Sequence, residues 1–177
     1  MDRCHPDRPR RAPLPTCWLM TDERMGEALW RALERLPRGG GVVFRHYTLP
    51  PGERRRWFAR VRRVALRRGL VLVRAGMVRM AGEMGTHARR GAGVVTWPVH
   101  DVGEARAARR ARANAVFVSP VFATRSHPGA AGLGFRRARA IGRVAGVPII
   151  ALGGMSEARF RCLHGFHGYA AIDAWSV

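Results

Sequence analysis

The sequence predicts an α/β fold with a parallel sheet, on the basis of two observations. Short apolar runs alternate along the chain with amphipathic segments, the order expected when helices connect the strands. Runs such as VLV at 71–73 and VPIIA at 147–151 are apolar at every position, which is typical of strands buried on both faces. Seven to eight such strands can be counted. A closed barrel and a doubly wound open sheet both satisfy this pattern, and the alternation alone does not choose between them.

The amino-terminal half begins with residues 1–15, a Pro- and Arg-rich tail that we expect to be flexible. Asp22 is expected to cap the first helix and Gly69 to end the second. Between Met77 and Arg90 the pattern is weak. The expected strands of this half are 17–22, 41–47 and 70–75, and the expected helices are 27–36 and 53–68.

The carboxy-terminal half shows the alternation more regularly. Its expected strands are 94–99, 115–122, 147–154 and 169–175, and its expected helices are 104–113, 135–146 and 156–165. The five tryptophans of the chain are scattered over different elements. We therefore expect them in the core or at its rim, and not in a surface on which nucleic-acid bases stack.

The charge balance is strongly basic, with 32 basic and 12 acidic residues and a formal net charge of +20. Every basic residue is Arg and none is Lys, which together with the many Ala and Gly residues is the composition of a GC-rich genome. No nucleic-acid-binding motif accompanies the charge, so we favour a solvated basic surface and expect neither nucleic acid nor a membrane as partner. A phosphorylated small molecule fits the charge equally well.

Cysteine usage and the chain start indicate the compartment. The three cysteines are far apart and lack the CxxC or Cys/His spacing of a metal site, so neither a disulfide framework nor bound zinc is expected. The first residues contain charges and Pro but no apolar core of a signal peptide, and no apolar run is long enough for a membrane span. A cytoplasmic location is expected.

Three motifs follow one another from the middle of the chain to its end. PVHDVGEA places His100 and Glu104 where a strand passes into a helix, SPVFATRSHPG follows the next strand, and PIIALGGM ends the strand after that with Gly153 and Gly154. From His100 to Trp175 this order resembles the thiamine phosphate synthase and thiazole tautomerase family. The amino-terminal half agrees with that family in spacing but poorly in motif.

The resemblance implies a single (β/α)₈ TIM-barrel-like domain over residues 16–177. At 177 residues the chain is short for such a barrel, which usually has roughly 200 to 250 residues. We therefore expect abbreviation around the third and fourth β/α units, near residues 76–93, with a helix reduced to a loop and the barrel incomplete or distorted there. Exposed strand edges would result, and a homodimer could cover them.

The Gly153–Gly154 pair is the candidate phosphate site. Without side chains, their backbone N–H groups can approach a phosphate closely, and the following helix adds its positive end. A tight turn after a strand also needs glycine for steric reasons alone. The resemblance adds substrate contacts from Thr124 and Ser126, although a hydroxyl pair in a loop is also ordinary turn chemistry. Asp173 stands where the family has a phosphate-binding Ser, which is unfavourable for the family ligand.

The resemblance implies a magnesium and diphosphate site for the synthases, and this sequence departs from it. The first metal aspartate of the family falls at Ala75, and the second has no counterpart in GTHARRG at 85–91. Of the Gln-x-Arg-x-Lys pattern on the second strand only Arg45 remains, with Tyr47 in place of Lys, and the loop Lys is His127. A magnesium site without carboxylates is not expected, so we predict no cofactor and no synthase reaction.

The tautomerase branch of the family needs less, because a His at the position of His100 moves the proton and no diphosphate-binding metal takes part. His is suited to this task because its ordinary pKa is near neutrality. The alternative is a strand-end histidine bonded to a carbonyl. By position His87 matches the strand-four His of the family, but its segment is weak, and we therefore favour a surface loop for it.

Three functional hypotheses remain open from the sequence. The first is an enzyme of thiamine metabolism, either a synthase-like transferase or, better, a tautomerase-like isomerase that uses His100. The second is a catalytically silent barrel that binds a phosphorylated ligand. The third is a basic protein associated with nucleic acid, whose affinity would fall steeply with salt.

Overall fold

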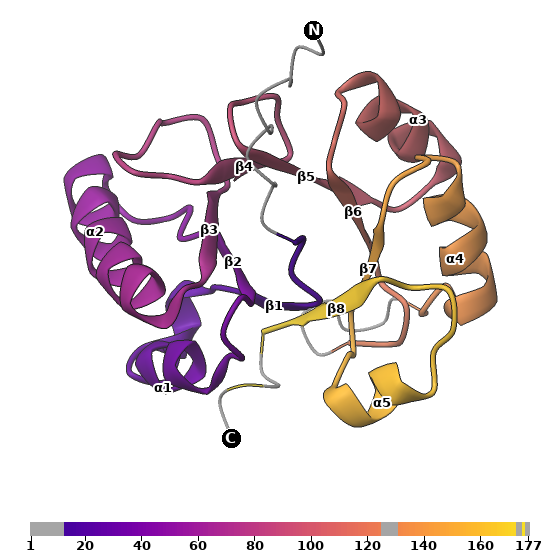
Figure 1. Ribbon diagram of the computed structural model, residues 1–177, viewed down its shortest axis with the longest axis horizontal. Helices are drawn as coiled ribbons and strands as arrows, with labels where there is room; N and C mark the ends of the chain where they lie inside the picture. Colours follow the sequence, from indigo (N-terminus) through magenta and orange to yellow (C-terminus); the bar gives the residue numbers. More distant parts are fainter. Residues whose placement is uncertain (1–12, 125–130, 173–174, 176–177) are drawn as a thin grey trace, which may run out of the picture.

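The computed structural model describes residues 13–124, 131–172 and 175, and its eight strands form a closed parallel barrel (Figure 1). Each strand pairs in parallel with the next along the chain, and the eighth pairs back with the first. The predicted TIM-barrel-like class is confirmed. The expected gap in the barrel is wrong, because a short strand within the weak segment completes the ring. Because the barrel is closed, the reason for expecting exposed strand edges, and a dimer that covers them, no longer holds.

All predicted strands and helices are present, mostly with tighter bounds. The strands are β1 Cys17–Met20, β2 Gly41–Phe44, β3 Val71–Arg74, β4 Gly85–His87, β5 Val94–Val99, β6 Ala115–Val118, β7 Ile149–Leu152 and β8 Gly168–Ala171. The helices are the 3₁₀ helix η1 Glu23–Met25 and the α-helices α1 Ala28–Arg35, α2 Pro51–Arg68, α3 Val102–Arg110, α4 Phe135–Arg143 and α5 Glu157–Arg161. Sequence analysis did not predict β4 or η1.

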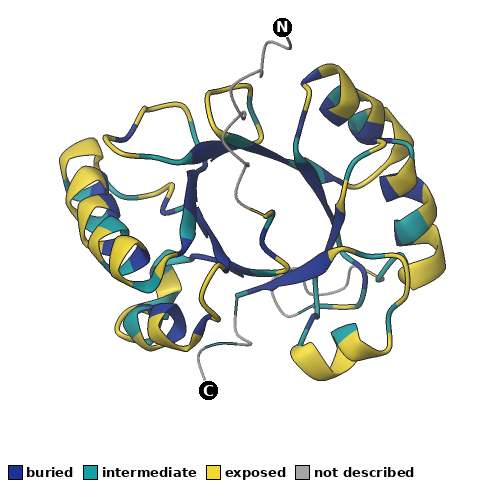
Figure 2. Cartoon of the chain, in the orientation of Figure 1, coloured by how far each residue is buried: buried dark blue, intermediate teal, exposed yellow. Residues whose placement is uncertain are grey.

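Side chains alternate between the barrel interior and the outer helices, as the two-residue period of a strand requires. Large apolar residues such as Trp18, Val43 and Phe117 fill the interior. Their strand neighbours form two outer clusters, one beneath α1 and α2 and one beneath α3 and α4. Figure 2 shows the strands buried and the helices exposed on their outer faces.

No helix lies between β3 and β4 or between β4 and β5, where residues 75–93 are all described. The expected abbreviation at the third and fourth units is therefore present. A loop covers the outer face of β3 instead. Arg74 points outward from β3 with only 3% of its side chain exposed, and its guanidinium pairs with Glu83 at 2.5 and 3.1 Å. Met80 from the same loop packs against the outer cluster.

Helix ends follow the predicted chemistry with one correction. Gly69 ends α2 in a left-handed conformation, with φ of 64°. Asp22 does cap a helix, but it accepts from the N–H of Arg24 and so starts η1, while α1 begins only after Glu27 without a side-chain cap. The three-residue η1 was not recognised because its pattern is too short for a helical period.

The segment before β1 closes the amino-terminal end of the barrel. The indole N–H of Trp18 donates to the carbonyl oxygen of Pro15 at 2.8 Å, and Leu14 packs against the interior cluster. Leu14 and Pro15 thus contact the barrel, although we had placed them in the tail. The rest of the predicted tail, residues 1–12, lies outside the described residues.

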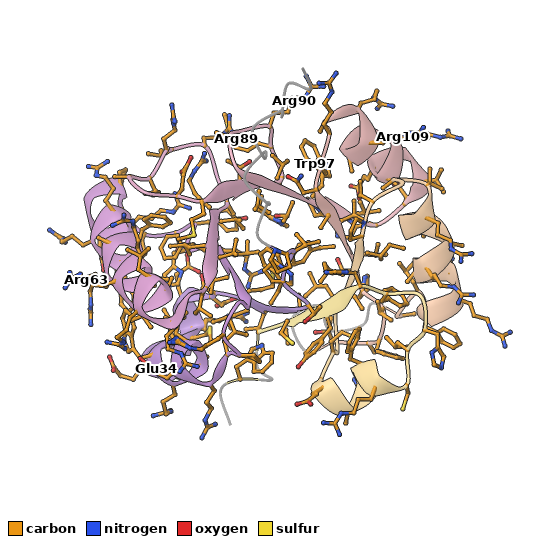
Figure 3. All side chains as sticks on the ribbon, viewed as in Figure 1. Glu34, Arg63, Arg89, Arg90, Trp97 and Arg109 are labelled. Carbon is orange, nitrogen blue, oxygen red and sulfur yellow. The ribbon has the colours of Figure 1, made fainter. Side chains whose placement is uncertain are left out.

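Most arginine side chains on the outer helices point into solvent, as Arg63 on α2 and Arg109 on α3 illustrate (Figure 3). This arrangement is the solvated basic surface that composition favoured. A search of the described helices finds no segment both long and apolar enough to span a bilayer.

Candidate functional site

The predicted site residues that the structure describes follow the carboxyl ends of different strands. Arg45 follows β2, His100 follows β5, Thr124 lies in the segment after β6, and the Gly153–Gly154 turn follows β7. Because all eight strands are parallel and closed, these ends meet at one rim, the face on which barrel active sites are built. Ser126, His127 and Asp173 lie outside the described residues.

Both glycines of the turn have conformations that favour glycine, with φ of 92° at Gly153 and 61° at Gly154. The turn is also crowded from one side. A Cβ at Gly153 would lie 2.8 Å from Cα of Pro120, and one at Gly154 would lie 2.6 Å from the carbonyl oxygen of Ala123. The N–H of Phe122 donates to the Gly153 carbonyl at 3.1 Å. Steric crowding and backbone conformation therefore both require glycine at these two positions.

The turn nevertheless leaves donors available. The backbone N–H groups of Gly153 and Gly154 donate to no acceptor among the described residues, although the two residues are only half-buried. Arg159 supplies a positive charge beside them, because its guanidinium donates to the Gly154 carbonyl and lies 5.2 Å from the ring of Phe122. Paired N–H groups with an adjacent guanidinium are a suitable arrangement for a phosphate or carboxylate.

Sequence analysis missed Arg159, which was hidden among many other arginines. Its position in the sequence is nevertheless informative. Arg159 comes three residues after the helix cap Ser156, so it lies in the first turn of the helix that follows the glycine pair. The helix α5 itself has five residues, fewer than expected, so its positive end adds little to the site.

Arg45 is held at the rim by the preceding β/α turn. Its Nε donates to the Thr21 carbonyl at 2.7 Å, and its Nη2 pairs with Asp22 at 3.1 Å. Asp22 also accepts from the Arg24 side chain, and that hydrogen bond is the main reason why its pKa falls to about 2. Arg45 is therefore fixed in place and partly neutralised, which favours positioning of a ligand over capture of a highly charged one.

His100 is exposed and oriented by its own helix. The side chain is 55% exposed, and its Nδ1 lies 2.8 Å from Oε2 of Glu104, which also accepts from the His100 backbone N–H. A carboxylate only accepts hydrogen bonds, so Nδ1 carries a proton, and in the neutral ring the lone pair is then on Nε2. An imidazole oriented in this way can accept a proton. The alternative of a carbonyl-bonded histidine is not what the structure shows.

His87 lies in a buried strand, and its expected place in a surface loop is wrong. It is the last residue of β4, 5% exposed, with its ring in edge contact with Phe117 inside the barrel. Three residues are too few for a strand period to be visible in the sequence, so the burial could not be inferred.

One buried arginine near the rim, Arg54, makes its hydrogen bonds to the backbone. Arg54 on α2 donates to the carbonyl oxygens of Arg45, His46 and Ala75, and so ties the ends of β2 and β3 together. It also lines a groove between the β2–α2 and β3–β4 segments, which Tyr47 and Met77 border with exposed side chains. Sequence analysis missed Arg54 because nothing in its spacing separates it from the exposed arginines of the same helix.

The structure does not fit the magnesium ion of the synthases. Ala75 offers a methyl group where a carboxylate is needed, and its carbonyl is bonded to Arg54. The nearest carboxylate in the sequence, Glu83, is paired with Arg74 on the outer face of the barrel. No cluster of three metal-ligating side chains exists among the described residues.

Comparison with protein families places more than half of the chain in a known family. Residues 85–174 match the family described as Thiamine monophosphate synthase. This range covers β4 to β8 and contains the predicted rim residues except Arg45.

A curated relative from Aquifex aeolicus (strain VF5), named "Putative thiamine-phosphate synthase 2", is 28% identical over 82 residues. The match covers 45% of this chain and 44% of that relative, so the chain matches less than half of the relative's length.

Solved structures match over nearly the whole chain. A thiamine phosphate pyrophosphorylase from Pyrococcus furiosus superposes with a TM-score of 0.76 at 21% identity, covering 94% of this chain and 90% of that one. A structure described as native KDPGal gives a TM-score of 0.59 at 12% identity, with 89% and 82% covered. At these identities the likeness concerns the fold, and it includes the amino-terminal half that motifs did not cover.

Proposed function

Because the chain belongs to the thiamine monophosphate synthase family, we propose that it binds a phosphorylated small molecule of thiamine metabolism, of the thiazole phosphate type. The phosphate would bind at the Gly153–Gly154 turn. The observation that carries this proposal is the pair of N–H groups, without an acceptor in the described part of the chain, beside the Arg159 guanidinium. Thr124, in the neighbouring segment, is the further contact that the family resemblance suggests.

The chemistry available at this rim is proton transfer, not diphosphate displacement. Departure of diphosphate needs stabilisation of negative charge, and the described residues of the rim include no cluster of carboxylates that could hold a metal for that purpose. His100, oriented by Glu104, would instead take a proton from one carbon of a bound thiazole carboxylate through Nε2 and return it to another carbon of the same molecule. We therefore propose at most a tautomerase-like isomerase that needs no cofactor. A cytoplasmic location and the absence of a nucleic-acid partner stay predictions.

A silent binding barrel is the second candidate. The observation that favours it is the exposure of His100, since a proton-transfer residue works best in a site that excludes water. Turnover of a thiazole carboxylate phosphate by the wild type, lost in His100→Gln while thiazole phosphate still binds, would select the isomerase. Binding without turnover would select the silent barrel.

The first test is a calorimetric titration with thiazole phosphate at low and high salt, on wild type, Gly153→Asp and Gly69→Asp. The control adds the same charge at another positive-φ glycine, with open space around it and at the opposite end of the barrel. We expect saturable binding that survives salt, is lost in Gly153→Asp and persists in Gly69→Asp. Equal weakening in both variants, or binding that salt abolishes, would reject the turn as the phosphate site.

A further inference from the structure

A groove on the helix side of the sheet takes no part in the proposed phosphate site. It lies between the β2–α2 and β3–β4 segments, which Figure 1 shows on the α2 side of the barrel. The guanidinium of Arg54 in its lining lies 5.5 Å from the ring of Phe44, which belongs to the cluster beneath α1 and α2 and not to the barrel interior. The groove is therefore separate from the barrel mouth and from the glycine turn after β7.

The groove is small and mostly apolar. Its volume is about 190 Å³, below the roughly 300 Å³ at which pockets for drug-sized ligands begin, so it suits a small molecule with a single ring. Tyr47, Met77 and Val78 border it with exposed side chains. Exposed apolar side chains that gather around a groove are typical of a binding site. Among the described residues that line it, Arg54 alone carries a charge.

The guanidinium of Arg54 is buried but incompletely bonded. Arg54 is 7% exposed, and its Nε donates to the His46 carbonyl at 2.8 Å. Nη2 donates to the carbonyls of Arg45 and Ala75 at 3.0 and 2.6 Å. Nη1 has no acceptor among the described residues, and it is not among the fully enclosed polar atoms that lack one. Because Arg54 lines the groove, we take the free Nη1 to open into it.

The positive charge of Arg54 is not balanced by a carboxylate. No described carboxylate forms an ion pair with its guanidinium. Glu23, the acidic group that acts on it, accepts instead from the N–H of Thr48 at 2.9 Å. Burial is the main reason why the pKa of Arg54 is lowered, but an arginine keeps its proton in a protein. Because buried charges are normally paired, this guanidinium can accept a negatively charged partner.

The donors of the groove favour a carboxylate over a phosphate. A phosphate carries up to two charges on three oxygens and needs several donors. The groove offers one free guanidinium nitrogen and apolar walls, which match a singly charged group on an apolar body. We propose that the groove is a second ligand site, which binds a small organic carboxylate with its charge on Nη1 of Arg54 and its apolar body against Met77 and Val78. This site does not depend on the proposed function.

Methionine methyl groups can report on the two sites separately. Of the seven methionines in the chain, Met77 and Met80 line the groove, whereas Met155 follows the glycine turn. In spectra of protein labelled with ¹³C at the methionine methyl groups, phenylacetate should shift the signals of Met77 and Met80 saturably and leave Met155 unchanged. Phenylacetamide has the same shape without the charge and should bind about tenfold more weakly. Equal affinity for the two molecules, or no shift with phenylacetate, would overturn the proposal.

Two variants test the charge of the groove. Val78→Asp adds a negative charge to its wall and should weaken phenylacetate binding about tenfold, with little effect on phenylacetamide. Val102→Asp makes the same change at an exposed valine of α3 and should match the wild type. Arg54→Met keeps an apolar stem and should abolish the preference for phenylacetate over phenylacetamide. Because Arg54 also ties β2 to β3, thermal unfolding of this variant is measured first, and where it unfolds Val78→Asp decides.

Other occupants of the groove give different results. A dimer in sedimentation, with Met77 and Met80 signals that follow protein concentration and ignore phenylacetate, would make the groove an interface between copies and overturn the proposal. Inorganic phosphate that shifts these signals as strongly as phenylacetate would overturn the choice of a carboxylate. Thiazole phosphate without effect on Met155 would count against the proposed function alone. Saturable binding of phenylacetate to a monomer, weakened in Val78→Asp and unchanged in Val102→Asp, supports the proposal.

Discussion

The ends of β4 and β7 lie at the same rim of one barrel and are built in opposite ways. After β7 comes a glycine turn whose N–H groups have no acceptor among the described residues, then a capped helix, as in a regular β/α unit. After β4 comes no helix, and the strand itself holds only three residues. Polar side chains stabilise this region, through the Arg74–Glu83 ion pair outside the barrel and the His87–Thr96 hydrogen bond inside it.

The difference shows that a barrel can close without its full set of helices. Closure needs parallel register between neighbouring strands, which β4 keeps on both sides through two or three residue pairs. The outer face of the sheet needs only to be covered, and a loop with one salt bridge and one methionine covers it at β3. Such a unit should depend on few interactions, and single substitutions should reveal this.

The largest effect is expected at the loop that replaces the helix. Glu83→Gln leaves the Arg74 guanidinium buried without its carboxylate, and we expect a loss of about 3 kcal/mol in the free energy of unfolding, measured in urea. Glu157→Gln, in the exposed pair with Arg161 near β7, should cost less than about 0.5 kcal/mol. Equal losses in the two variants would contradict the special dependence of the β4 side on this pair.

The next effect is the pH dependence that the interior of β4 adds to stability. The pKa of His87 is about 4 in the folded protein against an ordinary 6.5, so its contribution is complete above pH 6.5 and is lost as the pH falls through 6.5 toward 4. The unfolded chain takes up the proton first, which should remove about 1.5 kcal/mol between pH 6.5 and pH 5.

His87→Gln removes this titration while keeping a polar side chain, so its unfolding free energy should vary less over the same pH range. The comparison isolates His87, because the carboxyl groups titrate alike in both proteins. Parallel curves for the wild type and the variant would show that His87 is protonated as easily in the folded protein as in the unfolded chain.

The smallest effect is expected on the regular side. Ser156 caps α5 through a 3.3 Å hydrogen bond to the N–H of Arg159, and Ser156→Ala should cost about 0.5 kcal/mol in thermal unfolding. Asp101 caps α3 with a 2.8 Å bond, and Asp101→Ala should cost about 1 kcal/mol. A larger loss at Ser156 than at Asp101 would mean that the glycine turn depends on the cap for its shape.

The same contrast explains how far the sequence could predict the fold. Long apolar runs such as that of β7 were recognised because every residue of the strand is apolar, and Gly69 marked the end of α2 correctly. The β4 segment was not recognised because Gly, Thr and His give no period over three residues. The strand exists because its neighbours β3 and β5 offer it pairing partners, a tertiary effect that local sequence does not contain.

Prediction of the candidate site was limited in a similar way. Rim positions could be inferred from strand ends, so Arg45, His100 and the glycine pair all lie where parallel strands end. The contacts of these side chains could not be inferred from the sequence. The Glu104 partner of His100 and the Asp22 partner of Arg45 depend on side-chain rotamers and on the paths of the loops. Arg159 was hidden by the abundance of arginine, and His87 by the weakness of β4.

The packing around Trp18 limits how a ligand can enter and leave the barrel. Its ring fills the amino-terminal end so closely that a Cβ on Gly41 would lie 2.2 Å from it, and its indole N–H is tied to Pro15. A ligand can therefore enter and leave the barrel interior from the carboxyl rim and not from the end that Trp18 fills. A bound ligand must dissociate before a second ligand can bind at the carboxyl rim. Two ligands of this site should therefore compete with each other for binding.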